Sequence, residues 1–143
     1  MTNAFQWVDS LRVDGVVKLP FGEVSSPVID SRDIASVAAE ALSSDQHAGK
    51  IYTLSGPESI TPRQQVQILG EVLSGNYSFE TIPDDIAREN MLRRMPVPIV
   101  DAILELSRQT NFSEVLSTVK EVTGREPRTF KQWSIDYMEA FML

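Results

Sequence analysis

Two carboxylates and a guanidinium stand together where a predicted strand passes into a predicted helix. Asp30, Arg32 and Asp33 follow the β-branched residues Val28 and Ile29, and the apolar residues after them recur at helical spacing. Open α/β sheets bind ligands at the carboxyl ends of their strands, so Asp30 and Asp33 are candidate catalytic groups and Arg32 is a candidate substrate contact. Helix capping and an Asp–Arg ion pair explain the same residues without any ligand, and the sequence favours this structural alternative.

A second group of polar residues surrounds the end of a strand predicted at residues 50–54. Tyr52 is a candidate catalytic proton donor, while Glu58 and Arg63 could orient a substrate. An arginine in the first turn of a helix, such as Arg63, is more often simply solvated. His47 is the only imidazole, but it lies in the loop before this strand, on the side of the sheet away from the expected pocket, so we do not expect it to be catalytic.

Large apolar residues from both halves of the chain are candidates for a binding pocket. Aromatic residues and methionines usually fill cores, so most of them are expected to be ordinary core residues. Apolar walls with a few polar groups would nevertheless suit a hydrophobic ligand. The candidate substrate-binding residues of this kind are Trp7, Phe21, Met91 and Met95, with Phe5 and Trp133 as further pocket candidates.

The elements that must position these groups change in character after residue 82. Strands are predicted at residues 28–29, 50–54 and 77–82, with a fourth candidate at 16–19 after a short helical or irregular lead-in. Helices are predicted from about residue 30 to 42 and over 61–74, 83–94, 99–108, 119–124 and 129–141. This order predicts an α/β fold in a single domain. It consists of a truncated Rossmann-like βαβ remnant of about three parallel strands over residues 1–82 and a C-terminal helical cap over residues 83–143.

The sharpest helix boundary is predicted at Thr61. Thr61 is a favourable N-cap residue, Pro62 suits the first helical position, and Gln64 completes a capping box. Thr129 and Gln132 repeat this spacing before the last predicted helix.

Composition narrows the classes of function. The 143 residues contain 42% hydrophobic and 23% charged residues, carry a net charge of −7 and include no cysteine. Scattered cations on an acidic chain do not predict a nucleic-acid surface, and one histidine without cysteines does not predict a zinc site. No segment reads as a membrane span or a signal peptide, so the expected partners exclude membranes and the expected location is cytoplasmic.

Three motifs, in this order and spacing, resemble a known family. They are VIDSRDIA at residues 28–35, HAGKIYTLSGPE at 47–58 and TGREPRTFKQW at 123–133. Together they resemble the C-terminal half of NmrA-like proteins, the atypical short-chain dehydrogenases. The lead-in from Phe5 to Gly22 is similar to the family's segment after its fifth Rossmann strand, so the resemblance covers nearly the full chain.

The resemblance implies a Rossmann domain that binds NAD(P)H, a smaller substrate subdomain, and either reduction of quinones and other small molecules or redox-sensing regulation. The glycine-rich dinucleotide fingerprint of that fold is absent from the sequence, and so is a Tyr-x-x-x-Lys pair. We therefore expect no cofactor binding by this chain alone, and NAD(P)H only if a partner chain completes the site.

Three functions remain open at this stage. The first is a stand-alone protein that binds a small hydrophobic molecule and self-associates as a homo-oligomer, with cofactor-independent isomerase or cyclase activity as one form of it. The second is an NAD(P)H-dependent oxidoreductase, acting on a quinone or related substrate, whose Rossmann half is another chain. The third is a non-catalytic regulatory or interaction protein. In each case residues 28–42 are expected to form the broken edge of the sheet and to contact a partner.

Overall fold

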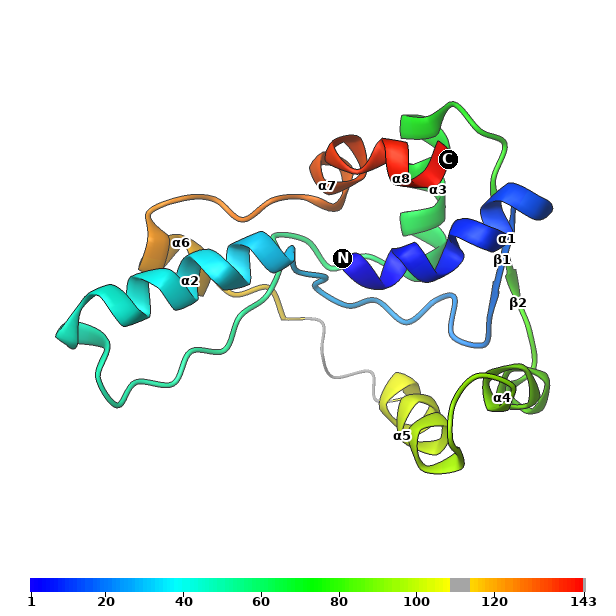
Figure 1. Ribbon diagram of the computed structural model, residues 1–143, viewed down its shortest axis with the longest axis horizontal. Helices are drawn as coiled ribbons and strands as arrows, with labels where there is room; N and C mark the ends of the chain where they lie inside the picture. The colour runs from blue at the N-terminus through cyan, green and yellow to red at the C-terminus, as the bar shows by residue number, and fades with distance from the viewer. Residues whose placement is uncertain (109–113, 143) are drawn as a thin grey trace.

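A small parallel sheet lies among helices in the computed structural model, which describes residues 1–108 and 114–142 (Figure 1). Within these residues the sheet has two strands, β1 (Val16–Leu19) and β2 (Ser78–Thr81), paired in parallel with Val17 opposite Phe79. The predicted strands at 16–19 and 77–82 are confirmed, as is the α/β class. The parallel pairing requires a long crossover between the strands, and the helices between residues 31 and 73 provide it.

Helices make up most of the remaining elements, and each predicted helix is present. The terminal helix differs from the prediction because it is interrupted at Tyr137. Among residues 1–108 and 114–142, no helix combines the length and the apolar character needed to cross a membrane. In chain order the helices are η1 (Thr2–Trp7), α1 (Val8–Val13), α2 (Ser31–Ser43), η2 (Asp45–His47), α3 (Pro62–Leu73), α4 (Asp84–Leu92), α5 (Val97–Arg108), α6 (Thr118–Thr123), α7 (Phe130–Asp136) and α8 (Met138–Met142).

Both predicted capping boxes are confirmed. The Thr61 hydroxyl accepts a hydrogen bond from the backbone N–H of Gln64 at 3.1 Å, and the Gln64 side chain accepts one from the N–H of Thr61 at 2.8 Å. Thr129 and Gln132 make the same reciprocal pair at 3.2 and 2.8 Å. These bonds satisfy N–H groups that have no partner within the helix, so they fix the starts of α3 and α7 locally.

Two other predicted strands do not form in the described part of the chain. Residues 28–29 and 50–54 pair with no other strand. The nearest strand-like contact is one isolated antiparallel bridge between Ser26 and Ile60. The predicted βαβ unit across residues 28–54 is therefore wrong for this structure. A strand exists only through pairing with a neighbour, and here Ile51 is 95% exposed, with no strand beside it among the described residues.

The apolar face predicted for α2 is also largely uncovered. Val37 is buried, but Ile34 is 44% exposed and Leu42 is 89% exposed. Figure 1 shows α2 and the segment after it projecting away from the rest of the molecule, with α6 alongside. The prediction that this face packs on a sheet is wrong here, because the two strands it needs are not formed.

The main core lies between the sheet, α3 and the C-terminal helices. Leu69, Phe130 and Trp133 are fully buried, and the Phe5 ring packs with its centroid 5.0 Å from that of Trp133. Trp133 was a pocket candidate, but it is a core residue because the rings of Phe5, Phe130 and Tyr137 surround it.

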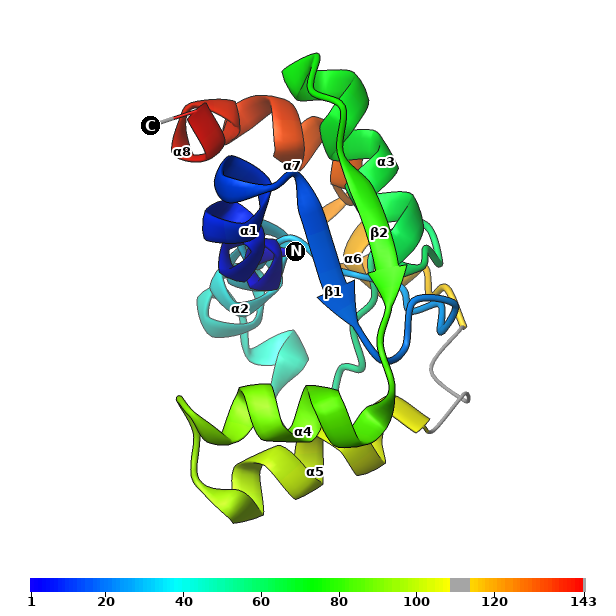
Figure 2. The same cartoon turned by 90° about the vertical axis from the view of Figure 1, so that its right-hand side faces the viewer.

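A separate helical pair, α4 and α5, lies at the carboxyl ends of the strands. Figure 2 shows both helices below the arrowheads of β1 and β2. Ala87 and Val100 are buried in this pair, and Arg88 on α4 forms an ion pair with Asp101 on α5 at 3.0 Å. The pair extends the molecule at the edge where parallel sheets bind ligands.

Candidate functional site

A groove of about 660 Å³ opens where the carboxyl end of β1 meets α4 and the N-terminal helices. Its apolar lining includes Phe5, Trp7, Leu19, Ile82, Met91 and Met95. Three of the predicted substrate-binding residues, Trp7, Met91 and Met95, thus lie on one groove although up to 88 positions separate them in the sequence. Ligand binding by these residues stays a prediction.

Local structure explains how α4 reaches the groove. The N–H of Ile82 donates to the carbonyl of Leu19 at 3.2 Å, which continues the strand pairing by one residue before α4 begins. Met91 and Met95 lie one helical turn apart, and the N–H of Met95 donates to the carbonyl of Met91 at 3.0 Å. Both thioether side chains are therefore presented along one wall.

Polar side chains complete the groove. Gln6, Asp9 and Ser10 come from the N-terminal helices, Lys18 from β1, Asn90 from the end of α4, and Arg93 and Arg94 from the turn that follows α4. Sequence reasoning did not select any of these residues. The signal that could have found them is position, because residues 18–20 and 82 lie at the carboxyl ends of predicted strands and the carboxyl ends of parallel strands share one edge.

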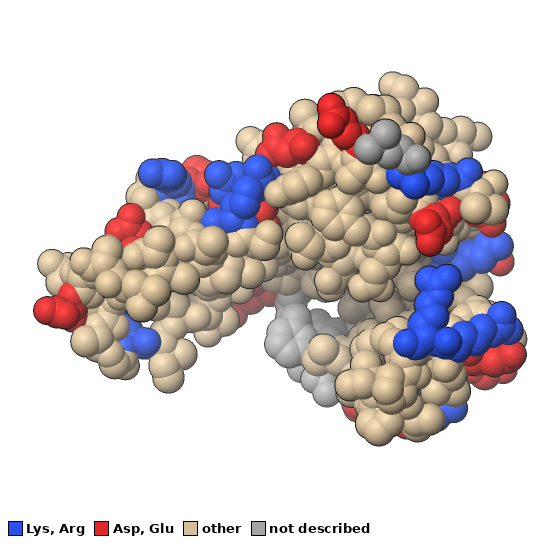
Figure 3. All heavy atoms as spheres, in the orientation of Figure 1, with Lys and Arg blue, Asp and Glu red and all other residues tan. Residues whose placement is uncertain are grey.

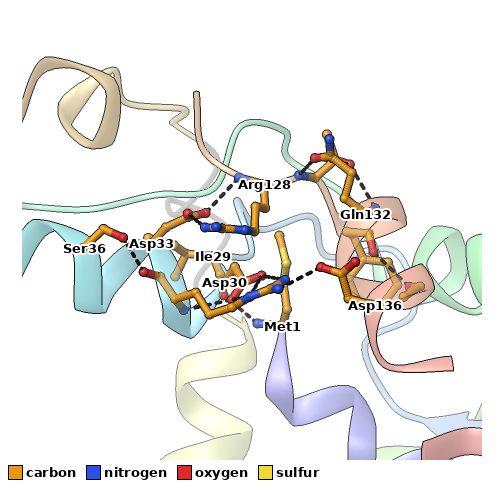
Figure 4. A network of polar contacts seen from close by, with 12 residues as sticks. Met1, Ile29, Asp30, Asp33, Ser36, Arg128, Gln132 and Asp136 are labelled. Atoms are coloured by element: carbon orange, nitrogen blue, oxygen red, sulfur yellow. Dashed lines mark hydrogen bonds and ion pairs between the residues drawn. The ribbon is translucent and has the colours of Figure 1, made fainter. Parts of the chain in front are cut away.

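Asp30 is not among the residues that line this groove. Its carboxylate is held by contacts within the protein (Figure 4). Asp30 is fully buried and caps α2 by accepting from the N–H of Arg32 at 2.8 Å. The Arg32 guanidinium pairs with Asp30 at 2.6 Å and with Asp136 of α7 at 2.7 Å. Burial opposes ionisation of Asp30, but the hydrogen bonds and charge of Arg32 outweigh it and hold the pKa of Asp30 below its ordinary value.

Asp33 and Glu58 also bind other parts of the chain through their carboxylates. Asp33 is buried, accepts from the backbone N–H of Arg128 at 2.8 Å and forms an ion pair with the Arg128 side chain (Figure 4). Glu58 accepts from the N–H of Phe130 at 3.1 Å, at the start of α7. We call Asp30, Arg32, Asp33, Arg128 and Asp136 the polar network; it ties α2 to α7 and to the segment before it. The capping and ion-pair alternative for Asp30, Arg32 and Asp33 is thus realised, and their catalytic and substrate roles stay predictions.

The remaining candidates lie elsewhere. Tyr52 shares a 2.7 Å hydrogen bond with Nδ1 of His47 on the projecting α2 side. Arg63 pairs with Glu23 at 2.6 Å and donates to the carbonyl of Phe79 at 3.0 Å. Phe21 lines smaller cavities on another face. The structure therefore does not gather the predicted residues into one site; it places them in the groove, in the polar network and at separate positions.

Comparison with known proteins gives relatives along almost the full chain. No protein-family model matches it. It is 38% identical over 144 residues to the (4-alkanoyl-5-oxo-2,5-dihydrofuran-3-yl)methyl phosphate reductase of Streptomyces griseus, covering 99% of this chain and 51% of that protein. It is 30% identical over 145 residues to the NAD(P)H azoreductase of Xenophilus azovorans, with the same two coverages.

Solved structures show the same fold relation. The NADPH-dependent quinone oxidoreductase of Escherichia coli aligns with a TM-score of 0.81 and 17% identity, over 96% of this chain and 51% of that one. The triphenylmethane reductase of Citrobacter aligns with a TM-score of 0.75 and 17% identity, over 99% and 48%. The chain thus spans about half the length of each relative. The sequence relatives and the three ordered motifs show that the chain corresponds to the C-terminal half of an NmrA-like protein, an atypical short-chain dehydrogenase, and the solved structures share its fold.

Proposed function

We propose that this chain is the substrate-binding half of an NAD(P)H-dependent reductase and that the groove holds the organic acceptor. The observation that carries the proposal is the apolar groove at the carboxyl edge of the sheet, where open α/β folds bind ligands. The names of the two sequence relatives support the reaction class, because both are reductases matched along 99% of this chain. A quinone or a related small acceptor suits the lining of Trp7, Met91 and Met95.

The residues of this chain do not fit the dinucleotide itself. The sequence lacks the glycine-rich turn that brings a pyrophosphate to a helix N-terminus, and the buried Asp30 carboxylate already occupies the N-terminus of α2. When bound, NAD(P)H supplies a hydride. The part proposed for this chain is to orient the acceptor and to keep water from it, with the cofactor held by a dinucleotide-binding half on the same polypeptide or on a partner.

We propose that this second half docks on the projecting side of the molecule. Leu42, near the end of α2, is 89% exposed, and Ile51, within the predicted strand 50–54 that pairs with no strand among the described residues, is 95% exposed. Exposed apolar residues and unpaired backbone both favour association, and a neighbouring strand would satisfy the two together. A homo-oligomer formed through the same surface is the competing arrangement.

The cofactor-independent isomerase or cyclase has less support. Such a reaction needs a poised acid or base, and Asp30 and Asp33, two of the residues proposed for that role, are engaged in ion pairs away from the groove. A purely regulatory role leaves the groove without a purpose. A reductase function accounts for the groove and agrees with the names of the two sequence relatives.

Substrate binding is tested with 1,4-naphthoquinone in equilibrium dialysis against the wild-type chain and two variants. Met91→Glu places a charge in the apolar wall, so we expect affinity to fall at least tenfold, which corresponds to about 1.4 kcal/mol. Met142→Glu is the matched control, because Met142 is exposed on α8 and does not line the groove. Equal quinone affinity of wild type and Met91→Glu would contradict the proposal.

Docking is tested with the separately produced dinucleotide-binding half of the Streptomyces griseus relative. Size-exclusion chromatography with light scattering should show a one-to-one complex that the double change Leu42→Glu and Ile51→Glu abolishes. Val13→Glu is the control, since Val13 is as exposed but lies at the end of α1. A homodimer that persists in the presence of the second half would favour the competing arrangement.

A further inference from the structure

The polar rim of the groove is predominantly basic. Its lining contains three cations, Lys18, Arg93 and Arg94, against a single carboxylate, Asp9 on α1. This is the reverse of the chain as a whole, which carries a net charge of −7. Figure 3 shows Lys and Arg side chains gathered over the helical pair α4 and α5, at the lower right of the view.

These cations are weakly paired. Lys18 lies 3.6 Å from Asp14 and 3.9 Å from Glu80, and Arg93 lies 3.4 Å from Glu89, all on exposed side chains. Exposed pairs of this kind contribute little binding energy and exchange readily for another anion.

Arg94 differs from several other arginines, which have a carboxylate partner at close range. No ion pair is present at Arg94 among the residues that the structure describes. By contrast, Arg32 and Arg63 each contact a carboxylate at 2.6 Å. Arg88 of α4 contacts the carboxylate of Asp101 on α5 at 3.0 Å. The guanidinium of Arg94 is therefore available at the mouth of an apolar groove.

The apolar wall and the basic rim come from one short segment. Met91 and Met95 line the groove, and Arg93 and Arg94 lie between them in the chain. A ligand that rests against the methionines therefore places any polar end within reach of the guanidinium groups, whose planar donor sets match the oxygens of phosphate and carboxylate.

We propose that the groove selects amphiphilic anions: an apolar body against Trp7, Met91 and Met95, and a phosphate or carboxylate at Arg93 and Arg94. This inference rests on the proposed function, in that it assigns a substrate class to the same groove. Cations at the C-terminal end of a helix also stabilise the helix dipole, so the test must separate ligand selection from helix stability.

Isothermal titration calorimetry of the chain with octyl phosphate, octanoate and octanol provides this separation. We expect octyl phosphate to bind about tenfold more tightly than octanol, the order expected for a charge-assisted hydrogen bond. Arg94→Gln should remove this advantage and leave octanol affinity unchanged. Arg88→Gln is the matched control, because it removes the same charge from α4 at a position outside the groove lining.

Each outcome has a defined meaning. A preference for octyl phosphate over octanoate identifies the head group as phosphate, and the reverse order identifies it as carboxylate; both support the proposal. Octanol affinity equal to that of both anions overturns the inference while leaving the proposed function intact. If Met91→Glu does not weaken the binding of 1,4-naphthoquinone, the proposed function itself is overturned. If inorganic phosphate binds as tightly as octyl phosphate, selection of amphiphilic anions is overturned, because the apolar wall would then contribute nothing to affinity.

Discussion

The groove and the polar network differ in what their charged side chains contact. In the polar network, Asp30 and Asp33 are buried and each is held by an arginine and by backbone N–H groups. In the groove, Arg94 is exposed and is one of the lining residues, together with apolar side chains. Charged residues that attract attention in a sequence can thus be fully used by the fold, while the ones free to meet a ligand stand at positions without a motif.

The difference follows from the cost of burial. A buried carboxylate needs a counter-charge and hydrogen bonds, so a fold that buries Asp30 must supply them and leaves little capacity for a ligand. An exposed guanidinium has no such requirement, because water solvates it until an anion arrives. The polar network should therefore govern stability, and the groove should govern binding.

The largest expected effect on stability comes from Asp30→Ala. The change removes the cap of α2 and leaves Arg32 without its buried partner, so we expect the free energy of unfolding to fall by about 3 kcal/mol. Urea unfolding measures it. Asp136→Ala removes the exposed partner of the same arginine and should cost less than about 1 kcal/mol. Equal losses in the two variants would remove the distinction between buried and exposed partners.

The contribution of Asp30 should also depend on pH. Because its pKa in the folded state lies below the unfolded value of about 3.9, its stabilising effect is complete above that value and is lost as the pH falls through the lowered pKa. Unfolding free energies of wild type and Asp30→Asn should therefore differ near neutral pH and converge in acid. A difference that stays constant down to about pH 2 would show that ionisation of Asp30 is not involved.

A change at a groove residue should affect ligand binding more than stability. Met95 is only partly buried, so Met95→Ala is expected to lower the free energy of unfolding by about 1 kcal/mol, well below the value for a core methionine. The same variant should weaken 1,4-naphthoquinone binding measured by equilibrium dialysis. A stability loss comparable to that of Asp30→Ala would mean that the groove is part of the core.

The smallest expected change in stability is that of Arg94→Gln. With an exposed side chain and no ion pair among the described residues, it should stay within about 0.5 kcal/mol of wild type in urea unfolding. Its effect should instead be confined to anionic ligands. A large loss of stability would assign Arg94 to the helix end rather than to a ligand.

Local chemistry was enough to predict the helices. The capping boxes at Thr61 and Thr129 use atoms within three residues of each other, so their sequence signature and their structure coincide. The Asp30 cap and its pair with Arg32 are equally local and were expected as the structural alternative. The partners Asp136 and Arg128, about a hundred positions away, were not predictable from spacing.

The strands and the groove depended on tertiary structure. Residues 50–54 have the composition of a strand, but a strand requires a neighbour, and none lies beside them among the described residues. The groove joins residues 5–10, 17–20 and 82–95, and no periodicity reveals that these segments meet. The sequence by itself determined the helices, their caps and the family. The tertiary structure decided which strands pair and which charged side chains remain free to bind, because pairing and burial depend on residues distant in the chain.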